Sequence, residues 1–519
     1  MLKDFKNEPL TDFTLQVNVE AFQSALDTVK SEIGQTYPLV INDERIELDE
    51  VFASVNPSRP DEVVGLFANG NAKHADDAIQ AAAEAFKTWR YVGVEERARY
   101  VLKAAAEMRR RKHEFSAVMV LEVGKSWDEA DGDTAEAIDF LEYYARQMVR
   151  LADSSDQLAP NPPEQLSLEY IPLGVGAIIP PWNFPCAIAT GMVGAALVSG
   201  NTAVFKPAEQ SPWVAYKICE LFWDAGLPKG VLNFLTGPGE VVGARMVEHP
   251  QVRFVSFTGS REVGTQIYEK TARIQPGQKW LKRAILEMGG KDAVVVDETA
   301  DLEAAAQGIV AGAFGFQGQK CSAGSRAIIV DSVYDAVVGR VVEIAKGIKI
   351  GAPDNGPKVS LGPVIDPEAM KKIMDYVEIG QQEGNLLLGG HRVNTAENGY
   401  FIEPTIFGDV AGDARIAQEE IFGPVLTLIR AQDFDDALNI ANNTEYGLTG
   451  AVYSTDRARL EKARREYFVG NLYFNRKCTG ALVGVHPFGG FNMSGTDSKA
   501  GGPDYLLLFT QAKSIAEKL

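Results

Sequence analysis

One cysteine of this sequence stands in a setting that suits a nucleophile. Cys321 lies in a short polar loop between Gly318 and Gly324, after an apolar stretch with the pattern of a helix. A loop of small and polar residues keeps sulfur accessible, and we expect the Lys320 ammonium beside it to favour the thiolate, the reactive form of cysteine. Taken alone, a free cysteine is more often a small buried hydrophobic residue, so other segments must decide its role.

Two groups that follow apolar strands suit the same chemistry. Asn183 comes after the stretch 175–179 in a proline-rich loop, and an amide held rigidly is a suitable donor to an oxyanion. Glu287 lies between another apolar strand and two glycines, where burial would raise the pKa of its carboxyl group and suit it for general base catalysis. The alternative for Asn183 is a rigid turn whose amide bonds its own backbone.

Three further groups at strand ends suit a dinucleotide. Ser260 follows the predicted strand 254–257 and can open a helix toward a pyrophosphate. Lys206 and Glu209 follow the predicted strand 203–205 and offer an ammonium and a carboxylate to a ribose. A carboxylate at that place repels a 2′-phosphate, which favours NAD over NADP. Taken singly, a turn that merely caps a helix is the commoner explanation for Ser260, and a solvated charge pair is the alternative for Lys206 and Glu209.

The part of the chain that carries these groups alternates short apolar strands with helices. The predicted strands are 175–179, 203–205, 231–235, 254–257, 293–296 and 326–330, and the clearest predicted helix is 302–314. Such alternation is typical of a parallel, doubly wound α/β sheet, in which ligands bind beyond the carboxyl ends of the strands. The pattern restarts after Glu287, and 519 residues exceed one ordinary domain, so we predict two α/β domains.

The flanking segments are less regular. We predict helices over 18–33 and 127–151 and a short strand over 39–41, while the proline-rich stretch 159–163 marks an excursion or linker. Near the other end, the apolar run 505–509 is predicted to be a flat strand. An exposed edge strand of that kind is prone to aggregate, so we expect another subunit to pair with it.

Composition and charge exclude several classes of protein. Hydrophobic residues make up 45% and charged residues 23%, which is ordinary for a globular protein. The net charge of −19 argues against a nucleic-acid partner. The sequence contains neither an apolar run of the roughly 18 residues that span a membrane nor a signal-peptide core, so we expect no membrane partner and a cytoplasmic location. Its four cysteines and five histidines are scattered, and we predict no metal site.

Seven motifs, taken in order, resemble the aldehyde dehydrogenase superfamily over about residues 40–519. They are PWNFP at 181–185, KPAE at 206–209, FTGS at 257–260, EMGG at 287–290, GQKC at 318–321, EIFGP at 420–424 and PFGG at 487–490. Each motif alone is moderate evidence, whereas seven in series are very specific. The segments 314–322 and 475–484 resemble the branch that oxidises L-glutamate γ-semialdehyde. The resemblance thus implies NAD-dependent oxidation of this aldehyde to L-glutamate, a step of proline breakdown.

The resemblance also implies roles for individual residues. Cys321 would be the nucleophile, Glu287 the general base, and Asn183 with the Cys321 N–H the oxyanion hole. Contacts to NAD are implied for Ile179, Lys206, Glu209, Gly239, Ser260, Gly264, Glu420 and Phe422. Contacts to the substrate are implied for Phe184, Ser322, Gly480, Ala481 and Phe488, of which Ser322, Gly480 and Ala481 would hold its α-carboxylate. Glu136 would meet the α-ammonium group.

The architecture implied by the resemblance has three parts. Residues 1–151 and 171–287 would form the NAD-binding domain, 288–485 the catalytic domain, and 152–170 with 500–519 a small β arm. The arm would join subunits into a homo-oligomer, as a dimer or an assembly of dimers, that acts on a small molecule. Two alternatives stay open: a dehydrogenase of another carboxylated semialdehyde, such as succinic semialdehyde, and a non-catalytic NAD-binding protein that kept the fold.

Overall fold

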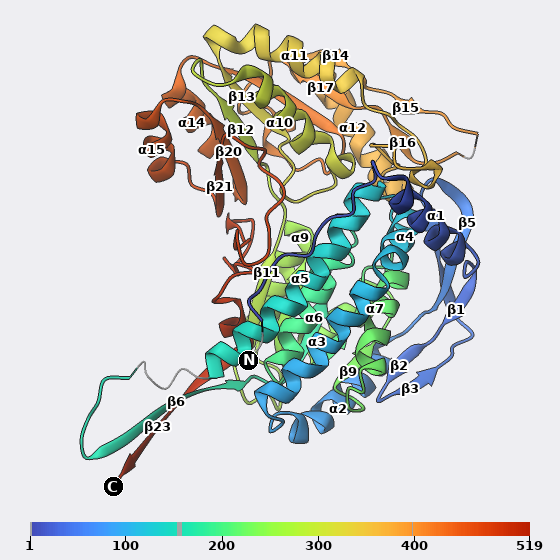
Figure 1. The fold of residues 1–519 in the computed structure, drawn as a ribbon, viewed down its shortest axis with the longest axis vertical. Helices are drawn as coiled ribbons and strands as arrows, with labels where there is room; N and C mark the ends of the chain where they lie inside the picture. Colours follow the sequence, from blue (N-terminus) through green and yellow to red (C-terminus); the bar gives the residue numbers. More distant parts are fainter. Residues whose placement is uncertain (1–2, 153–157, 397) are drawn as a thin grey trace.

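Two seven-stranded sheets organise the chain in this computed structural model, which describes residues 3–152, 158–396 and 398–519 (Figure 1). The first sheet has the order β11-β10-β7-β8-β9-β2-β3. Its strands are β2 (Leu39–Ile41), β3 (Glu44–Ile46), β7 (Val175–Ile179), β8 (Thr202–Phe205), β9 (Leu232–Phe234), β10 (Val252–Thr258) and β11 (Arg283–Glu287). The strands from β7 to β11 pair in parallel, and β2 and β3 add an antiparallel edge.

The second sheet has the order β14-β17-β18-β13-β12-β20-β21. Its strands are β12 (Ala293–Val296), β13 (Arg326–Val330), β14 (Asn385–Leu388), β17 (Thr405–Gly408), β18 (Val425–Ala431), β20 (Thr449–Tyr453) and β21 (Asn471–Phe474). All its pairs are parallel except β14 with β17. The predicted class, a doubly wound α/β fold with a second α/β unit, is therefore confirmed.

Helices cover both faces of each sheet, because successive residues of a buried strand point to opposite sides. In β12, for example, Ala293 and Val295 belong to one apolar core and Val294 and Val296 to another. The helices around the first sheet are α1 (Gln16–Lys30), α2 (Ala72–Trp89), α3 (Val94–Arg110), α4 (Lys112–Glu122), α5 (Trp127–Ala152), α6 (Ala187–Val198), α7 (Pro212–Asp224), α8 (Ala244–Glu248) and α9 (Arg261–Ala272). Those around the second are α10 (Leu302–Phe314), α11 (Tyr334–Lys346), α12 (Pro367–Glu383), α13 (Arg415–Gln418), α14 (Phe434–Asn442) and α15 (Arg457–Glu466). In the described ranges, no helix is both long and apolar enough to span a bilayer.

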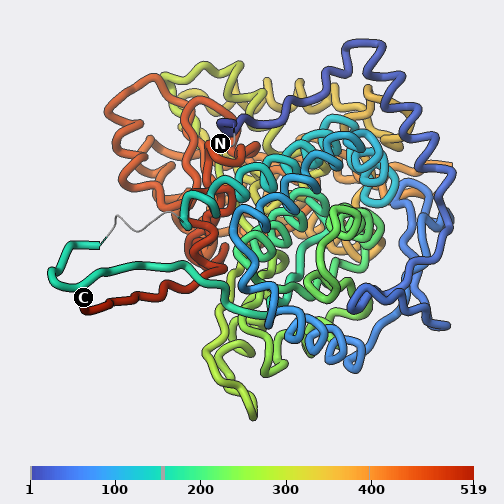
Figure 2. Tube along the Cα trace, turned by 60° about the horizontal axis from the view of Figure 1, so that its bottom comes forward, coloured from blue at the N-terminus to red at the C-terminus, as the bar shows by residue number. Residues whose placement is uncertain are grey.

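A two-stranded ribbon projects from the body (Figures 1 and 2). Its strands, β6 (Glu164–Pro172) and β23 (Thr510–Lys518), pair antiparallel along their whole length. β23 lies within the predicted segment 500–519, whereas β6 extends two residues beyond the predicted end at 170. Of the predicted segment 152–170, residues 153–157 lie outside the described part of the chain.

The prediction of an exposed strand over 505–509 is wrong. This run forms a short 3₁₀ helix, Tyr505–Phe509, and the strand begins only at Thr510. The ring of Tyr505 stacks on Tyr144 with centroids 5.3 Å apart, and Phe509 packs edge-on against Phe254 at 5.4 Å. Tyr505, Leu506 and Phe509 are therefore buried inside their own subunit, and Leu507 and Leu508 are half-buried.

A buried carboxyl group fixes the junction between α4 and α7. Glu122, at the end of α4, is only 1% exposed and accepts hydrogen bonds from the N–H groups of Trp213 (2.7 Å) and Val214 (3.0 Å). These are first-turn donors of α7, which have no partner inside their own helix. Burial raises the pKa of Glu122 to about 8. The carboxyl group thereby fixes the end of α4 against the start of α7, three residues before Lys125.

Replacing Glu122 by alanine should destabilise the fold. We expect Glu122→Ala to lower the free energy of the first unfolding transition in urea by about 2–3 kcal/mol, because two buried N–H groups lose their acceptor. The matched control is Glu96→Ala, which removes an exposed glutamate of α3 and should change this free energy by less than about 0.5 kcal/mol. Equal free energies of unfolding for the two variants would contradict the capping role of Glu122.

Candidate active site

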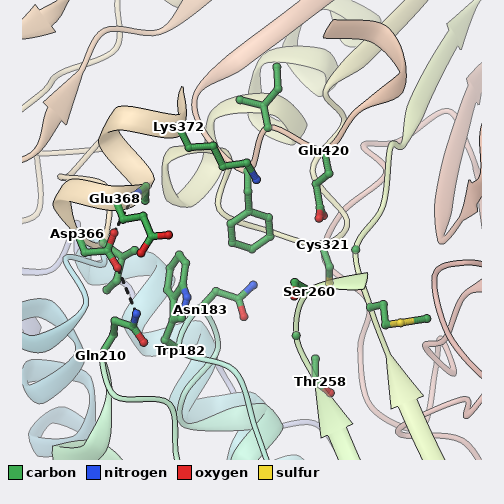
Figure 3. Close-up of a pocket in the computed structure, with 17 residues that line it drawn as sticks. Trp182, Asn183, Gln210, Thr258, Ser260, Cys321, Asp366, Glu368, Lys372 and Glu420 are labelled. Atoms are coloured by element: carbon green, nitrogen blue, oxygen red, sulfur yellow. Dashed lines mark hydrogen bonds between the residues drawn. The ribbon is translucent and has the colours of Figure 1, made fainter. Parts of the chain in front are cut away.

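A cavity of about 470 Å³ lies beyond the carboxyl ends of β7 and β10, facing α12 of the second unit. Such crevices are where open α/β sheets bind ligands. Five of the residues singled out from the sequence line it together: Asn183, Ser260, Cys321, Glu420 and Phe422 (Figure 3). Residues up to 239 positions apart in the chain therefore meet at one site.

A left-handed turn delivers Cys321 to this cavity. After α10 the chain passes through Phe316, Gln317 and Gly318, whose φ angles are 47°, 58° and 67°. A residue other than glycine in this region costs about 1–3 kcal/mol, so surrounding contacts must stabilise the turn. A side chain at Gly318 would also collide with the carbonyl of Gly423, so the position requires glycine for a second reason.

Two glutamine side chains supply part of that stabilisation. The Gln317 amide donates to the carbonyls of Gly124 (3.1 Å) and Pro363 (2.8 Å). The side-chain oxygen of Gln319 accepts from the N–H of Ile365 at 2.9 Å. Since both glutamines are buried, these bonds are shielded from water and fix the turn to neighbouring loops.

A buried lysine contacts both sides of the site. The Lys125 Nζ lies 3.9 Å from the ring centroid of Phe184, which follows Asn183, and 4.3 Å from that of Phe316 in the turn. It pairs at 3.1 Å with Asp133, whose other oxygen accepts from the N–H of Ala187 at 2.7 Å. Lys125 and the Asp133 side chain are fully buried, where cation–π contacts and paired charges are strongest. Sequence reasoning missed this pair.

The Asn183 amide is held beside the loop of the cysteine. Its Nδ2 donates to the carbonyl of Gln319 at 3.1 Å, and its oxygen accepts from the N–H of Phe184 at 3.1 Å. The predicted local turn and the predicted preorganised donor therefore coexist in one side chain. The second amide hydrogen and the N–H of Cys321 are suited to donate to an oxyanion.

Glu287 is half-buried and is not among the residues that line the cavity of Figure 3, although the next two residues are. It accepts hydrogen bonds from the hydroxyl of Ser498 and the N–H of Gly490 (3.4 Å). Burial raises its pKa to about 7, although both bonds and the nearby Lys499 act in the opposite direction. A carboxyl group with such a pKa can accept a proton near neutral pH. No sequence signal connects Ser498 with Glu287, because 211 positions separate them.

The expectation that Lys320 favours the Cys321 thiolate is wrong. The Lys320 Nζ pairs with Glu129 at 2.6 Å. Burial, followed by the negative charges of Asp292 and Glu287, raises the pKa of the Cys321 thiol above its usual range. The sulfur is therefore protonated at rest, and its reaction requires a base that removes the proton.

Lys206 and Glu209, predicted to bind the cofactor ribose, follow β8, and the predicted cofactor residue Gly239 follows β9 and lies beside them. The Lys206 Nζ donates to Glu209 at 2.9 Å, and a Cβ atom at Gly239 would lie 3.8 Å from the same carboxylate. Lys206 is 2% exposed, so the alternative of a solvated charge pair is wrong for the lysine, while the Glu209 side chain is 42% exposed. Ile179, at the end of β7, is half-buried.

The other predicted cofactor residues lie around the start of α9 and the loop after α13. Ser260 accepts from the N–H of Val263 at 3.3 Å and so caps α9, as the simpler interpretation held, but it also lines the cavity. Gly264 allows Met288 to pack tightly on α9, since a side chain there would collide with the Met288 sulfur. Glu420 accepts from the N–H of Gly290 at 3.0 Å. Phe422 packs edge-on against Trp182, with centroids 5.5 Å apart.

The five predicted substrate residues do not line this cavity. Ser322 is buried directly after Cys321, whereas Gly480 is exposed and Ala481 half-buried. Across the described residues, the N–H groups of Gly480 and Ala481 donate to no protein acceptor. Phe184 contacts Lys125 as described above, and Phe488 is half-buried, with its N–H bonded to the Ala500 carbonyl at 2.8 Å.

Several cavity residues were not anticipated. They are Gln210, Asp366, Glu368 and Lys372, together with Trp182 (Figure 3). Gln210 donates to Asp366 at 3.2 Å and so joins the loop after β8 to the start of α12. Trp182 could have been proposed from the PWNFP motif, but the residues of α12 enter the site only through the packing of the two sheets.

Comparison with known proteins agrees with the fold. The family model described as "Aldehyde dehydrogenase family" matches residues 45–515, so this chain belongs to the aldehyde dehydrogenase family. It is 58% identical over 517 residues to the 1-pyrroline-5-carboxylate dehydrogenase of Geobacillus sp. (strain WCH70) and 56% identical to 1-pyrroline-5-carboxylate dehydrogenase 2 of Bacillus subtilis (strain 168), with both chains covered in full. It also superposes on a solved 1-pyrroline-5-carboxylate dehydrogenase from Thermus with bound NAD, at a TM-score of 0.98 and 52% identity over the whole of both chains. The family predicted from the seven motifs is confirmed.

The bond from Ser498 makes a specific pH prediction. The Ser498 hydroxyl stabilises the ionised form of Glu287, so Ser498→Ala should raise the pKa of Glu287 above about 7. If ionised Glu287 is the base, dehydrogenase activity rises with pH through this pKa. In Ser498→Ala we expect the rising limb of the profile of activity against pH to move to higher pH by roughly one unit. Ser514→Ala, an exposed serine of β23, is the control. An unchanged limb in Ser498→Ala would show that Glu287 does not set it.

Proposed function

We propose that this chain oxidises L-glutamate γ-semialdehyde to L-glutamate with NAD as hydride acceptor, as a step of proline breakdown. The observation that carries the proposal is the place of Cys321 in the fold. Its side chain lines the cavity of Figure 3, and the carbonyl of the next residue, Ser322, accepts from the Cys478 thiol at 3.5 Å. Cys478 lies two residues before Gly480, whose N–H, like that of Ala481, has no acceptor among the described residues and suits a carboxylate. The full-length similarity to enzymes called 1-pyrroline-5-carboxylate dehydrogenase supports the same substrate.

The covalent steps follow from the geometry of the chain's own groups. The Cys321 sulfur attacks the aldehyde carbon and loses its proton to a base, while Asn183 Nδ2 and the Cys321 N–H donate to the developing oxyanion. NAD, when bound, accepts the hydride that leaves the resulting tetrahedral carbon. Glu287 then takes a proton from a water molecule, which attacks the thioester carbon and releases the carboxylate product and the thiol.

The residues around the cavity fit NAD. The carboxylate of Glu209 and the ammonium of Lys206 suit the adenosine ribose, with Gly239 beside them, and Ser260 at the start of α9 suits the pyrophosphate. The proposed contacts to NAD also include Ile179, Gly264, Glu420 and Phe422. The last two would lie near the nicotinamide ribose.

The substrate is proposed to lie on the other side of Cys321. Ser322 and the N–H groups of Gly480 and Ala481 hold its α-carboxylate, because backbone donors bind an anion without a bulky cation. Phe184 and Phe488 flank its aliphatic chain. Glu136, whose pKa burial raises to about 8, is the proposed partner of the α-ammonium group, since a nearby cation would favour its ionised form.

The same proposal covers domains and assembly. Residues 1–151 and 171–287 bind the cofactor, 288–485 carry the nucleophile, and 152–170 with 500–519 form the arm. Within the described ranges, no other strand pairs with the ribbon of β6 and β23, and its two edges are suited to pair with another copy in a homo-oligomer. The four unpaired cysteines suit a reducing cytoplasm.

An aldehyde panel tests the proposed activity. Following NADH by absorbance, we expect a higher kcat/KM for L-glutamate γ-semialdehyde than for succinic semialdehyde or acetaldehyde. Cys321→Ala should lower activity by roughly a thousandfold or more, because no other cysteine among the described residues lines the cavity. The control is Cys219→Ala, which removes a buried thiol of α7 and should leave the activity near normal.

The alternatives give different results in this panel. A preference for succinic semialdehyde would assign the chain to that substrate. Binding of NAD without turnover of any aldehyde would make it a non-catalytic binding protein. Full turnover by Cys321→Ala would exclude the covalent mechanism.

Cofactor choice is tested at Glu209. A carboxylate at the ribose 2′-position repels the additional phosphate of NADP, so Glu209→Ala should narrow the preference for NAD, by roughly tenfold in the ratio of kcat/KM values. Glu240→Ala, the next residue after Gly239, is a nearby control. An unchanged ratio in Glu209→Ala would mean that this carboxylate does not face the 2′-position.

A further inference from the structure

The segment of residues 5–11, which we call the N-terminal strap, lies along α5 (Figure 1). The N–H of Glu8 donates to Asp139 at 2.7 Å, and the N–H and hydroxyl of Thr11 donate to Asp131 at 2.7 and 2.6 Å. Both aspartates belong to α5 and are almost fully buried, at 4% and 1% exposure. Hydrogen bonds to buried carboxylates are among the strong ones, so the strap has a fixed register on α5.

One side chain of the strap also reaches the second unit. The Asn7 Nδ2 donates one hydrogen to Asp139 at 2.8 Å and the other to the carbonyl of Val483 at 3.0 Å. The ring of Phe5 packs edge-on against Tyr143 of α5, with centroids 5.1 Å apart. A Cβ atom at Gly484 would lie 3.0 Å from both rings, so the strap contacts two successive residues of this loop.

The loop that the strap contacts is the one proposed to hold the substrate carboxylate. Val483 follows Ala481 by two residues, and the N–H of Gly484 is bonded from the other side to the carbonyl of Gly501 at 2.8 Å. Gly480, by contrast, is exposed, and its φ of 79° is one that glycine adopts easily. Its position, and that of Ala481, therefore depends on how the chain is fixed at 483 and 484.

Helix α5 carries the residue proposed to bind the other charged group of the substrate, its α-ammonium. Glu136, the proposed partner of the α-ammonium group, precedes Asp139 by three residues and so lies on the same face of α5. Asn7 thus connects the helix that would meet the ammonium to the loop that would meet the carboxylate. The strap precedes the part of the chain that the family model matches, which begins at residue 45.

We propose that Asn7 is a positioning residue for substrate selection, which sets the distance between α5 and the loop 480–485 so that the site accepts the α-amino-acid head group of the aldehyde. This proposal rests on the proposed function. It makes no demand on the chemistry at Cys321, so an aldehyde without a head group should be oxidised whether or not Asn7 is present.

The test compares two aldehydes in two asparagine variants. For Asn7→Ala we expect kcat/KM for L-glutamate γ-semialdehyde to fall roughly tenfold, mainly through KM, and kcat/KM for propionaldehyde to change less than about twofold. Asn7→Asp, which places a second carboxylate against Asp139, should show a larger loss of the same kind. The matched control is Asn18→Ala. The Asn18 amide also donates to a backbone carbonyl, that of Asp12 at 2.9 Å, and its removal should leave the ratio of the two kcat/KM values unchanged.

Hydrogen exchange provides a readout that does not depend on the reaction. We expect the amides of residues 480–485 to exchange faster in Asn7→Ala than in Asn18→Ala or the unmodified protein. Equal exchange, or an equal fall of kcat/KM for both aldehydes, would overturn the role of Asn7. If the unmodified protein itself shows no preference for L-glutamate γ-semialdehyde over propionaldehyde, the proposed function is what fails.

Discussion

The left-handed turn at Phe316, Gln317 and Gly318 is the constraint on which the site depends. It takes the chain from the end of α10 to Cys321, and it brings the backbone of Gly318 against the carbonyl of Gly423. Gly423 follows Phe422, itself left-handed at a φ of 60°, so the same close approach positions the loop of Glu420 and Phe422 across the cavity. Phe316 and Gln317 are not glycine, so their left-handed conformation costs free energy. The buried hydrogen bonds of Gln317 and the contact of the Lys125 cation with the Phe316 ring offset this cost.

Burial controls the protonation of the reacting groups. The Cys321 thiol and the Glu287 carboxyl are both shifted toward their neutral forms, since each loses water and the two negative charges would repel. As pH rises through about 7, Glu287 ionises and becomes able to accept a proton, while the thiol stays protonated. Near neutral pH, therefore, Glu287 can accept a proton while the Cys321 thiol still holds its own.

Much of the fold follows from local sequence patterns. The strands 175–179, 293–296 and 326–330 and the helix 302–314 have the predicted bounds, because their apolar runs end at turn residues. The run 505–509 has no such local signal: its aromatic residues pack on Tyr144 and Phe254, hundreds of positions away. The same limit applies within the site. Cys321, Glu287 and Asn183 stand in recognisable motifs, but Ser498 and Lys125 act through residues distant in the sequence, and the partner of Lys320 is visible only in the fold.

A crystal structure of the protein with L-glutamate tests the account most directly, since the product carries both ends of the proposed substrate. We predict that its γ-carboxylate lies beside Cys321, within hydrogen-bond distance of Asn183 Nδ2. Its α-carboxylate should lie against Ser322 and the N–H groups of Gly480 and Ala481. Glutamate bound in the opposite direction, or at a place remote from Cys321, would contradict it.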